Sequence, residues 1–313
     1  ILAGTPPAAI RGLIYRAGGR VVRNAPRPLI TDLDGLPHPA RHLIDNDRFR
    51  RLDNGRPQTV IRVSRGCPYH CFFCLATPLN GPRVRMRSPQ SIVREIGECV
   101  DRYGIRDFLL WADLFNAERG WVLSLCDEIA RAGLGVRWFS NVRANGVDGD
   151  LARAMKAAGC ELVSIGVESG DQGMLERMGK STTLADIRQA FAVLRAAGIR
   201  TLAYYLFGLP WETEETAERT IRFAIELDSD LASFFIATPL PGTRFYDHAV
   251  REGLLAEGDN GPRDVFEQAY HVPTVRSAGL SRDAIAAVQR RAVRRFFLRP
   301  AYIARTLAGI RSA

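Results

Sequence analysis

From Thr59 onward, short apolar segments alternate with longer amphipathic ones. The apolar segments are Thr59–Val63, Asp107–Ala112, Val136–Val142, Glu161–Val167, Thr201–Gly208 and Leu231–Ala237. They are nearly continuous in apolar character, which is typical of strands that are buried on both faces of a sheet. Strands that alternate with helices predict a parallel α/β fold. If the sheet forms a barrel or part of one, the chemistry is expected at the C-terminal ends of the strands.

The segments between these strands carry helix boundary signals. Ser88 followed by Pro89 is typical of a helix N-terminus, and Gly104 is typical of a helix end, so we predict a helix between them. Further helices are predicted within Gly149–Gly159 and Thr182–Gly198. Near the C-terminus, two more are predicted at Ser281–Leu298 and Ala301–Ile310, separated by Pro300.

The first 55 residues do not follow the alternating pattern. Ile10–Asn24 predicts a small hairpin whose turn is Ala17-Gly18-Gly19. The proline-rich stretch Asn24–Asp45 predicts an extended connector. We therefore divide the chain into a connector with a small hairpin (residues 1–55), an α/β core (residues 56–250) and a C-terminal helical extension (residues 251–313).

The composition of the chain bears on whether it binds membranes or nucleic acids. No apolar run reaches the roughly 18 residues that span a bilayer, and no signal peptide pattern is visible. Together with the free-thiol pattern described below, this predicts a reducing, cytoplasmic location. The formal net charge is +9, but no helix-turn-helix or zinc-finger pattern accompanies it, so we do not expect a nucleic-acid partner. The arginine- and aromatic-rich segment Gln289–Pro300 indicates either a solvated helix face or peripheral contact with an anionic membrane.

Three of the six cysteines lie within eight residues, in the sequence CPYHCFFC from Cys67 through Cys71 to Cys74. In a helix the three would share one face, but Gly66 and Pro68 disfavour a helix interior. A disulfide framework does not fit a chain of this length with so few cysteines. A metal site is the interpretation that remains.

The number of thiols bears on the kind of metal site. A structural zinc ion takes four ligands, whereas Cys99, Cys126 and Cys160 stand apart and are interpreted as buried core thiols. Three thiolates can hold three irons of a 4Fe–4S cluster and leave the fourth iron open, and an open metal position is typical of catalysis. A zinc-binding structural module stays open as an alternative.

The spacing Cys67-x3-Cys71-x2-Cys74, directly after the first predicted strand, resembles the cluster motif of the radical SAM superfamily. The resemblance extends over roughly the whole chain. It implies a partial (β/α)6 TIM-like barrel with a helical C-terminal extension. It also implies a 4Fe–4S cluster whose open iron binds S-adenosylmethionine (SAM). Reductive cleavage of SAM would then give a 5′-deoxyadenosyl radical that abstracts hydrogen from a substrate.

The resemblance assigns roles to side chains near the first three strand ends. Phe73 matches the aromatic residue that lies against the adenine. Asp113 follows the second strand and matches the segment at the methionine end of SAM, where many relatives have two adjacent acids. Arg143 ends the third strand and resembles the arginine that approaches the methionine carboxylate or the substrate. An ordinary surface arginine is the alternative for Arg143.

Further roles follow at the last three strand ends. Glu168, within Gly166–Gly170, resembles the residue that accepts hydrogen bonds from the ribose hydroxyls; an ordinary salt-bridge partner is the alternative. Gly208 and Pro210 resemble the turn that shapes the cofactor pocket, and Thr238 lies in the segment that resembles the adenine end of the site.

Three segments together resemble the cobalamin-dependent subgroup, which includes anaerobic Mg-protoporphyrin ester cyclase-like enzymes and hopanoid- and phosphonate-modifying relatives. They are Ser64–Cys74, Ala25–Arg41 and Phe296–Ile303. In that subgroup a cobalamin-binding domain precedes the radical SAM domain. Because this chain starts at Ile1 without a methionine, we expect that domain to lie outside these residues and the full-length protein to bind cobalamin.

This subgroup implies cobalamin-dependent methylation or ring formation. The implied partners are a small-molecule substrate, lipid or tetrapyrrole-like, and an electron donor such as flavodoxin or ferredoxin. A cobalamin-independent radical SAM oxidoreductase and a non-catalytic metal-binding module are the alternatives.

Overall fold

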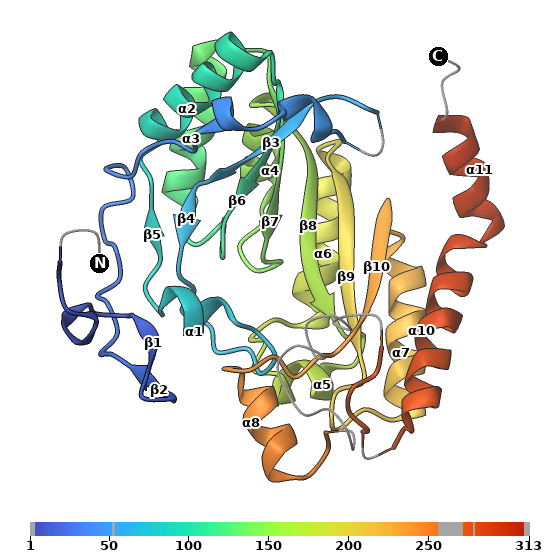
Figure 1. Cartoon of the computed structure of the whole chain (residues 1–313). Helices are drawn as coiled ribbons and strands as arrows, with labels where there is room; N and C mark the ends of the chain where they lie inside the picture. Colours follow the sequence, from blue (N-terminus) through green and yellow to red (C-terminus); the bar gives the residue numbers. More distant parts are fainter. Residues whose placement is uncertain (1–3, 52–53, 256–271, 278, 310–313) are drawn as a thin grey trace.

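The computed structural model describes residues 4–51, 54–255, 272–277 and 279–309. Its centre is a six-stranded parallel sheet with the strand order β10-β9-β8-β7-β6-β3 (Figure 1). The strands are β3 (Gln58–Arg62), β6 (Asp107–Trp111), β7 (Arg137–Val142), β8 (Cys160–Glu168), β9 (Arg200–Phe207) and β10 (Leu231–Ile236). Each predicted strand is present, and each lies beside its neighbour in the chain. The predicted partial (β/α)6 barrel is therefore confirmed.

Helices join successive strands and cover one side of the sheet (Figure 1). The predicted helices correspond to α2 (Pro89–Tyr103), α4 (Gly149–Ala157), α6 (Leu184–Ala196), α10 (Arg282–Phe297) and α11 (Pro300–Gly309). Five further helices were not predicted from the sequence: α1 (Ala76–Asn80), α3 (Arg119–Ala132), α5 (Gln172–Arg177), α7 (Glu214–Leu227) and α8 (Arg244–Arg251). None of the helices in the described part of the chain combines the length and the apolar character that crossing a bilayer requires.

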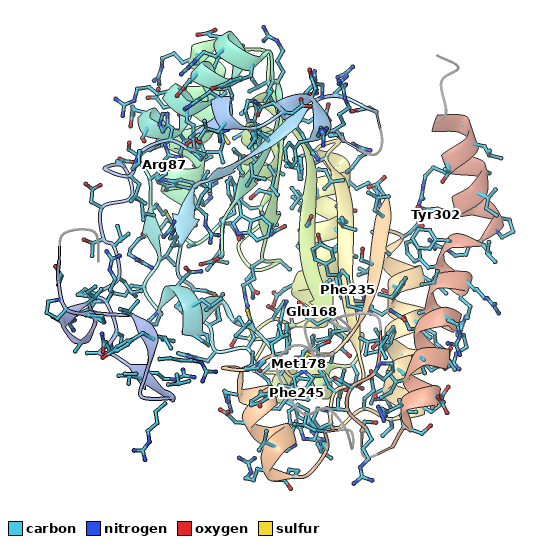
Figure 2. All side chains as sticks on the ribbon, viewed as in Figure 1. Arg87, Glu168, Met178, Phe235, Phe245 and Tyr302 are labelled. Carbon is cyan, nitrogen blue, oxygen red and sulfur yellow. The ribbon has the colours of Figure 1, made fainter. Side chains whose placement is uncertain are left out.

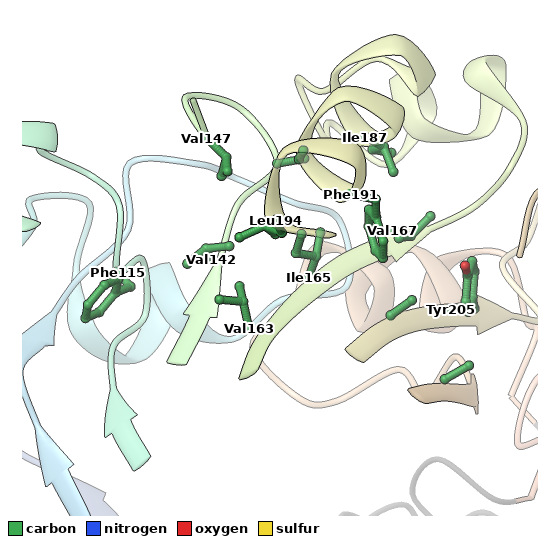
Figure 3. Packing of buried hydrophobic residues seen from close by; sticks show 14 of the residues in the cluster. Phe115, Val142, Val147, Val163, Ile165, Val167, Ile187, Phe191, Leu194 and Tyr205 are labelled. Carbon is green, nitrogen blue, oxygen red and sulfur yellow. The ribbon is translucent and has the colours of Figure 1, made fainter. Parts of the chain in front are cut away.

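Strand β8 shows how the sheet separates the core from the site. Its odd-numbered residues Val163, Ile165 and Val167 are fully buried on the side of α6 (Figure 3). Helix α6 covers them with Ile187, Phe191 and Leu194, which are also buried. The even-numbered residues of β8 point to the opposite face because side chains alternate along a strand. That face lines a cavity, described below.

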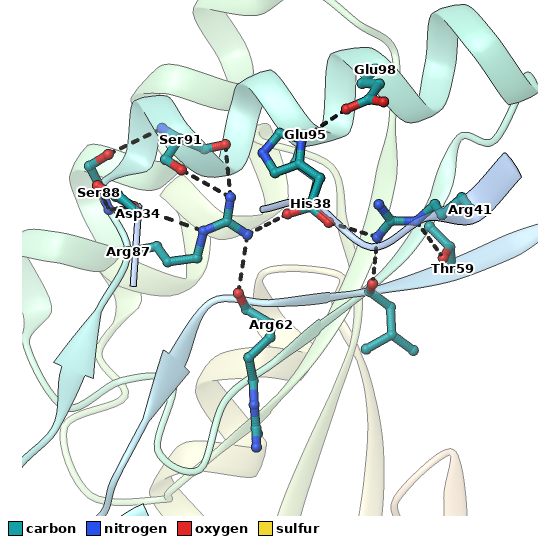
Figure 4. A network of polar contacts seen from close by, with 11 residues as sticks. Asp34, His38, Arg41, Thr59, Arg62, Arg87, Ser88, Ser91, Glu95 and Glu98 are labelled. Atoms are coloured by element: carbon teal, nitrogen blue, oxygen red, sulfur yellow. Dashed lines mark hydrogen bonds and ion pairs between the residues drawn. The ribbon is translucent and has the colours of Figure 1, made fainter. Parts of the chain in front are cut away.

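The N-terminal segment forms the predicted hairpin, from β1 (Ile14–Ala17) and β2 (Arg20–Arg23). The connector that follows is fixed to the core by a buried ionic network (Figure 4). In this network Arg41 of the connector donates to Oε1 of Glu95 on α2 at 2.7 Å, and Arg87 pairs with Oε2 of the same carboxylate. All three side chains are less than a tenth exposed. Asp34 adds a second contact, because it accepts hydrogen bonds from the Ser88 N–H at the start of α2.

This network predicts that Glu95 is essential to the stability of the connector junction. Replacing it in Glu95→Gln leaves buried Arg41 without its carboxylate partner and leaves Arg87 with only the partly exposed Asp34, 3.9 Å away. We therefore expect a loss of about 3–5 kcal/mol in the free energy of unfolding. Glu98→Gln on the same helix is the matched control, since Glu98 is a third exposed and pairs with His38 and Arg102. It should cost less than about 1 kcal/mol. Urea unfolding measures both, and equal losses would contradict the assignment.

A buried carboxyl group closes the turn after β9. Glu212 is 1% exposed, and its carboxylate accepts hydrogen bonds from the backbone N–H groups of Gly208 and Leu209. Burial nevertheless raises its pKa from 4.5 to about 8, because removal from water penalises the charged form. The folded chain therefore keeps a proton on Glu212 at pH values where the unfolded chain has released it.

The raised pKa predicts a specific pH dependence of stability. Between pH 4.5 and about 8 the folded state binds one more proton than the unfolded state, so the stabilisation present at low pH is lost as the pH rises. The slope is at most about 1.4 kcal/mol per pH unit. Glu212→Gln should remove this slope, whereas Glu214→Gln, in the exposed first turn of α7, should retain it. Urea unfolding at pH 5.5 and pH 8 tests this; an unchanged slope in Glu212→Gln would disprove it.

Candidate cofactor site

The three clustered cysteines lie in an irregular loop that follows β4 (Ser64–Arg65) and precedes α1. Residues 66–75 do not form a helix, so the alternative in which the cysteines share one helix face does not apply. The loop begins at Gly66, which has a φ of 98°. A Cβ atom there would lie 2.0 Å from the carbonyl oxygen of Arg83, so only glycine permits this close passage of two chain segments.

Backbone hydrogen bonds hold the loop on both sides. The Cys67 N–H donates to Gly81 O at 3.1 Å. At its centre, the Phe72 N–H donates to Met178 O at 2.8 Å, and Phe72 O accepts from the Phe245 N–H at 2.9 Å. Figure 2 shows Met178 and Phe245 close together below the sheet. The loop is therefore fixed between the end of α5 and the start of α8.

All three thiols open onto one cavity. Cys67, Cys71 and Cys74 are half-buried, and burial raises the pKa of Cys67 and Cys74. Because metal ligands must be thiolates, a bound cation would be needed to keep them deprotonated. Cys67, Cys71 and Cys74 are the three cysteines among the described residues that line this cavity. Three thiols fit an iron–sulfur cluster with one open iron better than a structural zinc ion, which takes four ligands.

The other three cysteines behave as predicted for core thiols. Cys99, Cys126 and Cys160 are at most 2% exposed. Burial raises the pKa of Cys99 to about 11 and that of Cys126 to about 12, and it also raises the pKa of Cys160 well above its usual value. Such thiols are unreactive near neutral pH.

The cavity brings together four of the predicted cofactor-binding residues with the cysteines. Phe73, Asp113, Arg143 and Glu168 all line it. Other lining residues escaped the sequence analysis: Tyr69, Ala76, Leu114, Asn141, Val142, Ser164, Gly166, Lys180 and Tyr204. Asn141, Ser164 and Tyr204 could have been found, because each is a polar residue within one of the predicted strands.

Glu168 occupies an unusual backbone conformation at the end of β8. The register of β8 against β9 shifts between Gly166 and Glu168, and Glu168 has a φ of 66°. A positive φ is strained for a residue with a side chain, and such strain is concentrated at functional sites. It turns the Glu168 carboxylate toward Lys180, whose Nζ lies 2.7 Å from Oε1. The salt-bridge alternative for Glu168 is thus present, while Oε2 has no partner among the described residues and stays available for a ribose hydroxyl.

Asp113 forms structural contacts that were not predicted from the sequence. Its Oδ2 accepts a hydrogen bond from the Gly66 N–H at 2.7 Å, and its Oδ1 lies 3.2 Å from Arg62. Both carboxylate oxygens are therefore engaged by the protein. Asp113 anchors the start of the cysteine loop, and its expected position at the methionine end of SAM stays a prediction.

Arg143 presents a cation to the cavity. Its guanidinium carbon lies 3.7 Å from the centre of the Tyr69 ring, and its Nε donates to Asn145 at 3.2 Å. Its Nη2 is buried and has no hydrogen-bond partner among the described residues. Because buried polar groups are almost always paired, Nη2 keeps a hydrogen-bonding capacity that these residues do not use. The surface-arginine alternative does not describe a half-buried residue in this position.

The remaining predicted residues lie at the correct sheet edge but outside this cavity. Gly208, Pro210 and Thr238 follow β9 and β10 and are buried, yet they are not among the described residues that line it. A Cβ atom on Gly208 would lie 3.0 Å from Ile285 of α10, and Gly208 has a φ of 89°. Gly208 thus allows α10 to pack closely against the turn. A role for these three residues in cofactor binding stays a prediction.

Comparison with known proteins agrees with this geometry. Residues 61–224 match a family model described as the radical SAM superfamily. An uncharacterized methyltransferase of Pyrococcus horikoshii is 33% identical over 291 residues, which cover 93% of this chain and 62% of the relative. An anaerobic magnesium-protoporphyrin IX monomethyl ester cyclase of Cereibacter sphaeroides is 32% identical over 241 residues, which cover 76% of this chain and 39% of the relative. The chain therefore spans less than two thirds of the length of these curated relatives.

Two solved structures share the fold. The first is the radical S-adenosylmethionine methyltransferase TsrM from Kitasatospora setae, with cobalamin and a 4Fe–4S cluster bound. It has a TM-score of 0.70 and 22% identity, and the match covers 96% of this chain and 65% of TsrM. The second is the cobalamin-dependent S-adenosylmethionine radical enzyme OxsB, with a TM-score of 0.75, 14% identity and coverage of 99% of this chain and 50% of OxsB.

The family match covers more than half of the chain and includes the cysteine loop and the cavity-lining ends of β6 to β9. The chain belongs to the radical SAM superfamily, whose members use a 4Fe–4S cluster and SAM.

Proposed function

We propose that this chain is the catalytic core of a radical SAM enzyme that carries out cobalamin-dependent methylation or ring formation on a small organic substrate. The observation that carries the proposal is one cavity that is lined by the three cysteines, by Arg143 and by the strained Glu168. When bound there, a 4Fe–4S cluster supplies the electron that cleaves SAM. Residues 56–250 form the core in this proposal, with the connector before it and the helical extension after it.

In this proposal, different residues of the cavity bind the cluster and the separate parts of SAM. Cys67, Cys71 and Cys74 would hold three irons, and the hydrogen bonds at Phe72 keep their loop in place. Arg143 offers its free Nη2 to a carboxylate, either that of SAM or that of the substrate. Glu168 offers Oε2 to the ribose hydroxyls while Lys180 fixes its orientation. Phe73 lies on the same cavity and offers its ring to the adenine.

The use of cobalamin is supported by the relatives. TsrM is a methyltransferase with cobalamin bound, and OxsB is cobalamin-dependent. The curated relatives include a bacteriochlorophyllide methyltransferase and cyclases of magnesium-protoporphyrin. These names favour methylation or ring formation over a cobalamin-independent oxidoreductase, and they support a tetrapyrrole-like substrate more than a lipid.

The surroundings of the enzyme follow from the same proposal. A cluster held by thiolates suits a reducing cytoplasm, with a flavodoxin or ferredoxin as electron donor. Peripheral membrane contact receives less support. Arg291 and Arg295 of α10 pair with Glu214 and Glu218 of α7, so much of the charge of Gln289–Pro300 is neutralised within the protein.

Substitution of the cysteines tests the cluster assignment. After anaerobic reconstitution, the parent should contain about four irons per chain. Cys67→Ala, Cys71→Ala and Cys74→Ala should each lose the cluster, because one iron then lacks its protein ligand. Cys99→Ala, Cys126→Ala and Cys160→Ala are matched controls and should keep it. Iron analysis and the visible absorption spectrum report the outcome; normal iron content in Cys71→Ala would rule out the assignment.

A second experiment tests the ribose position. Glu168→Gln removes the charged acceptor, and we expect SAM binding to weaken by about 1–3 kcal/mol with unchanged iron content. Glu161→Gln, at the opposite end of β8, pairs with Arg51 away from the cavity and should bind SAM like the parent. Equilibrium dialysis with labelled SAM measures both affinities. Equal affinity of parent and Glu168→Gln would place the ribose elsewhere.

A further inference from the structure

A second cavity lies against the outer side of the cysteine loop. Its described lining residues are Phe72, Arg177, Trp211, Arg244, Asp247, His248 and Arg251. None of them lines the cofactor cavity. Cys71, Phe73 and Cys74 face the cofactor cavity, whereas Phe72 between them faces this second one. The two cavities therefore lie on opposite sides of the same short loop.

Aromatic side chains connect the second cavity to the loop. The Phe72 ring lies 4.7 Å from the Trp211 ring and 5.7 Å from the His248 ring, measured between ring centres. Trp211 and His248 are 6.0 Å apart and only partly buried, while Phe72 is 5% exposed. A continuous set of ring contacts thus runs from the surface to the residue next to Cys71.

Two arginines that have no partner in the described part of the chain flank this aromatic group. Arg177 ends α5 and precedes Met178, whose carbonyl accepts from the Phe72 N–H. Arg244 begins α8 and precedes Phe245, whose N–H donates to the Phe72 carbonyl. Each arginine is therefore one residue away from a hydrogen bond to the cysteine loop.

Two positive charges at the second cavity are available to a binding partner. Arg177 and Arg244 are exposed, and neither guanidinium forms a hydrogen bond or ion pair with the residues that the structure describes. Arg251 is already engaged by Glu252 and His248. Asp247 is the one carboxylate among the described lining residues. Unpaired cations around partly exposed rings attract an anionic surface and steer its approach.

We propose that this second cavity is the docking surface of an acidic one-electron carrier, a flavin- or iron–sulfur-containing protein that reduces the cluster. This inference rests on the proposed function, because it requires a cluster at Cys67, Cys71 and Cys74. One electron leaves the reduced carrier and enters the cluster, and no bond forms or breaks. The carrier fits this side because Phe72, the residue next to Cys71, lines the second cavity, while the cofactor cavity stays free for SAM. Transient electron-transfer contacts are small, so a compact charged surface suffices.

The test uses the reconstituted 313-residue protein and a bacterial flavodoxin. Arg177→Glu/Arg244→Glu reverses both free charges, and we expect flavodoxin binding at low salt to weaken on the order of tenfold. Cleavage of SAM driven by flavodoxin should slow, whereas cleavage driven by dithionite should equal that of the parent. Arg290→Glu/Arg294→Glu on α10 is the matched control, since both residues are exposed, form no ion pair with other described residues and lie on another helix. Parent affinity should also fall as salt screens the charges.

The outcomes distinguish a failure of the proposed function from a failure of the docking surface alone. A parent that assembles no cluster, or does not cleave SAM with dithionite, disproves the proposed function itself. Flavodoxin binding that is unchanged in Arg177→Glu/Arg244→Glu, or lowered equally by Arg290→Glu/Arg294→Glu, overturns the docking surface alone. If the double variant loses its iron, Arg177→Gln and Arg244→Gln decide: each should weaken flavodoxin binding with normal iron content, and parental affinity in both would overturn the proposal.

Discussion

The site depends on how the cysteine loop is held to the barrel. Three thiols on an irregular loop can serve one cluster only if the loop has a fixed shape. Asp113 accepts a hydrogen bond from the first backbone N–H of the loop, that of Gly66. Two backbone hydrogen bonds of Phe72 join the centre of the loop to Met178 and Phe245. These contacts come from the end of β6, the end of α5 and the start of α8. Elements far apart in the sequence therefore determine where the three sulfur atoms lie.

The barrel supplies the complementary half of the site. Alternation along β8 sends its valine and isoleucine side chains to α6, and it sends Ser164, Gly166 and Glu168 to the cavity. The register shift before Glu168 and its positive φ then turn one carboxylate toward Lys180. A strained residue persists only where its surroundings hold it. Here the fully buried core behind β8 provides that support.

Much of the fold could be predicted from the sequence because its signals are local. The six apolar segments and the caps at Ser88 and Gly104 depend on neighbouring residues, and all were confirmed. The grouping of Phe73, Asp113, Arg143 and Glu168 with the cysteines could also be predicted, since strand ends of a parallel sheet meet at one edge. Contacts between residues that are far apart in the sequence could not be predicted. Lys180 beside Glu168, Arg62 and Gly66 around Asp113, and Ile285 against Gly208 follow from tertiary packing that no local pattern encodes.

The central claim is that the three thiols leave one iron of a cluster open to SAM in the cavity. Electron paramagnetic resonance of the dithionite-reduced protein, recorded with and without SAM, tests this most directly. The account predicts the signal of a reduced 4Fe–4S cluster whose g-values change when SAM is added, with couplings to labelled nitrogen and oxygen of the methionine portion. A cluster signal that SAM leaves unchanged, without such couplings, would contradict it.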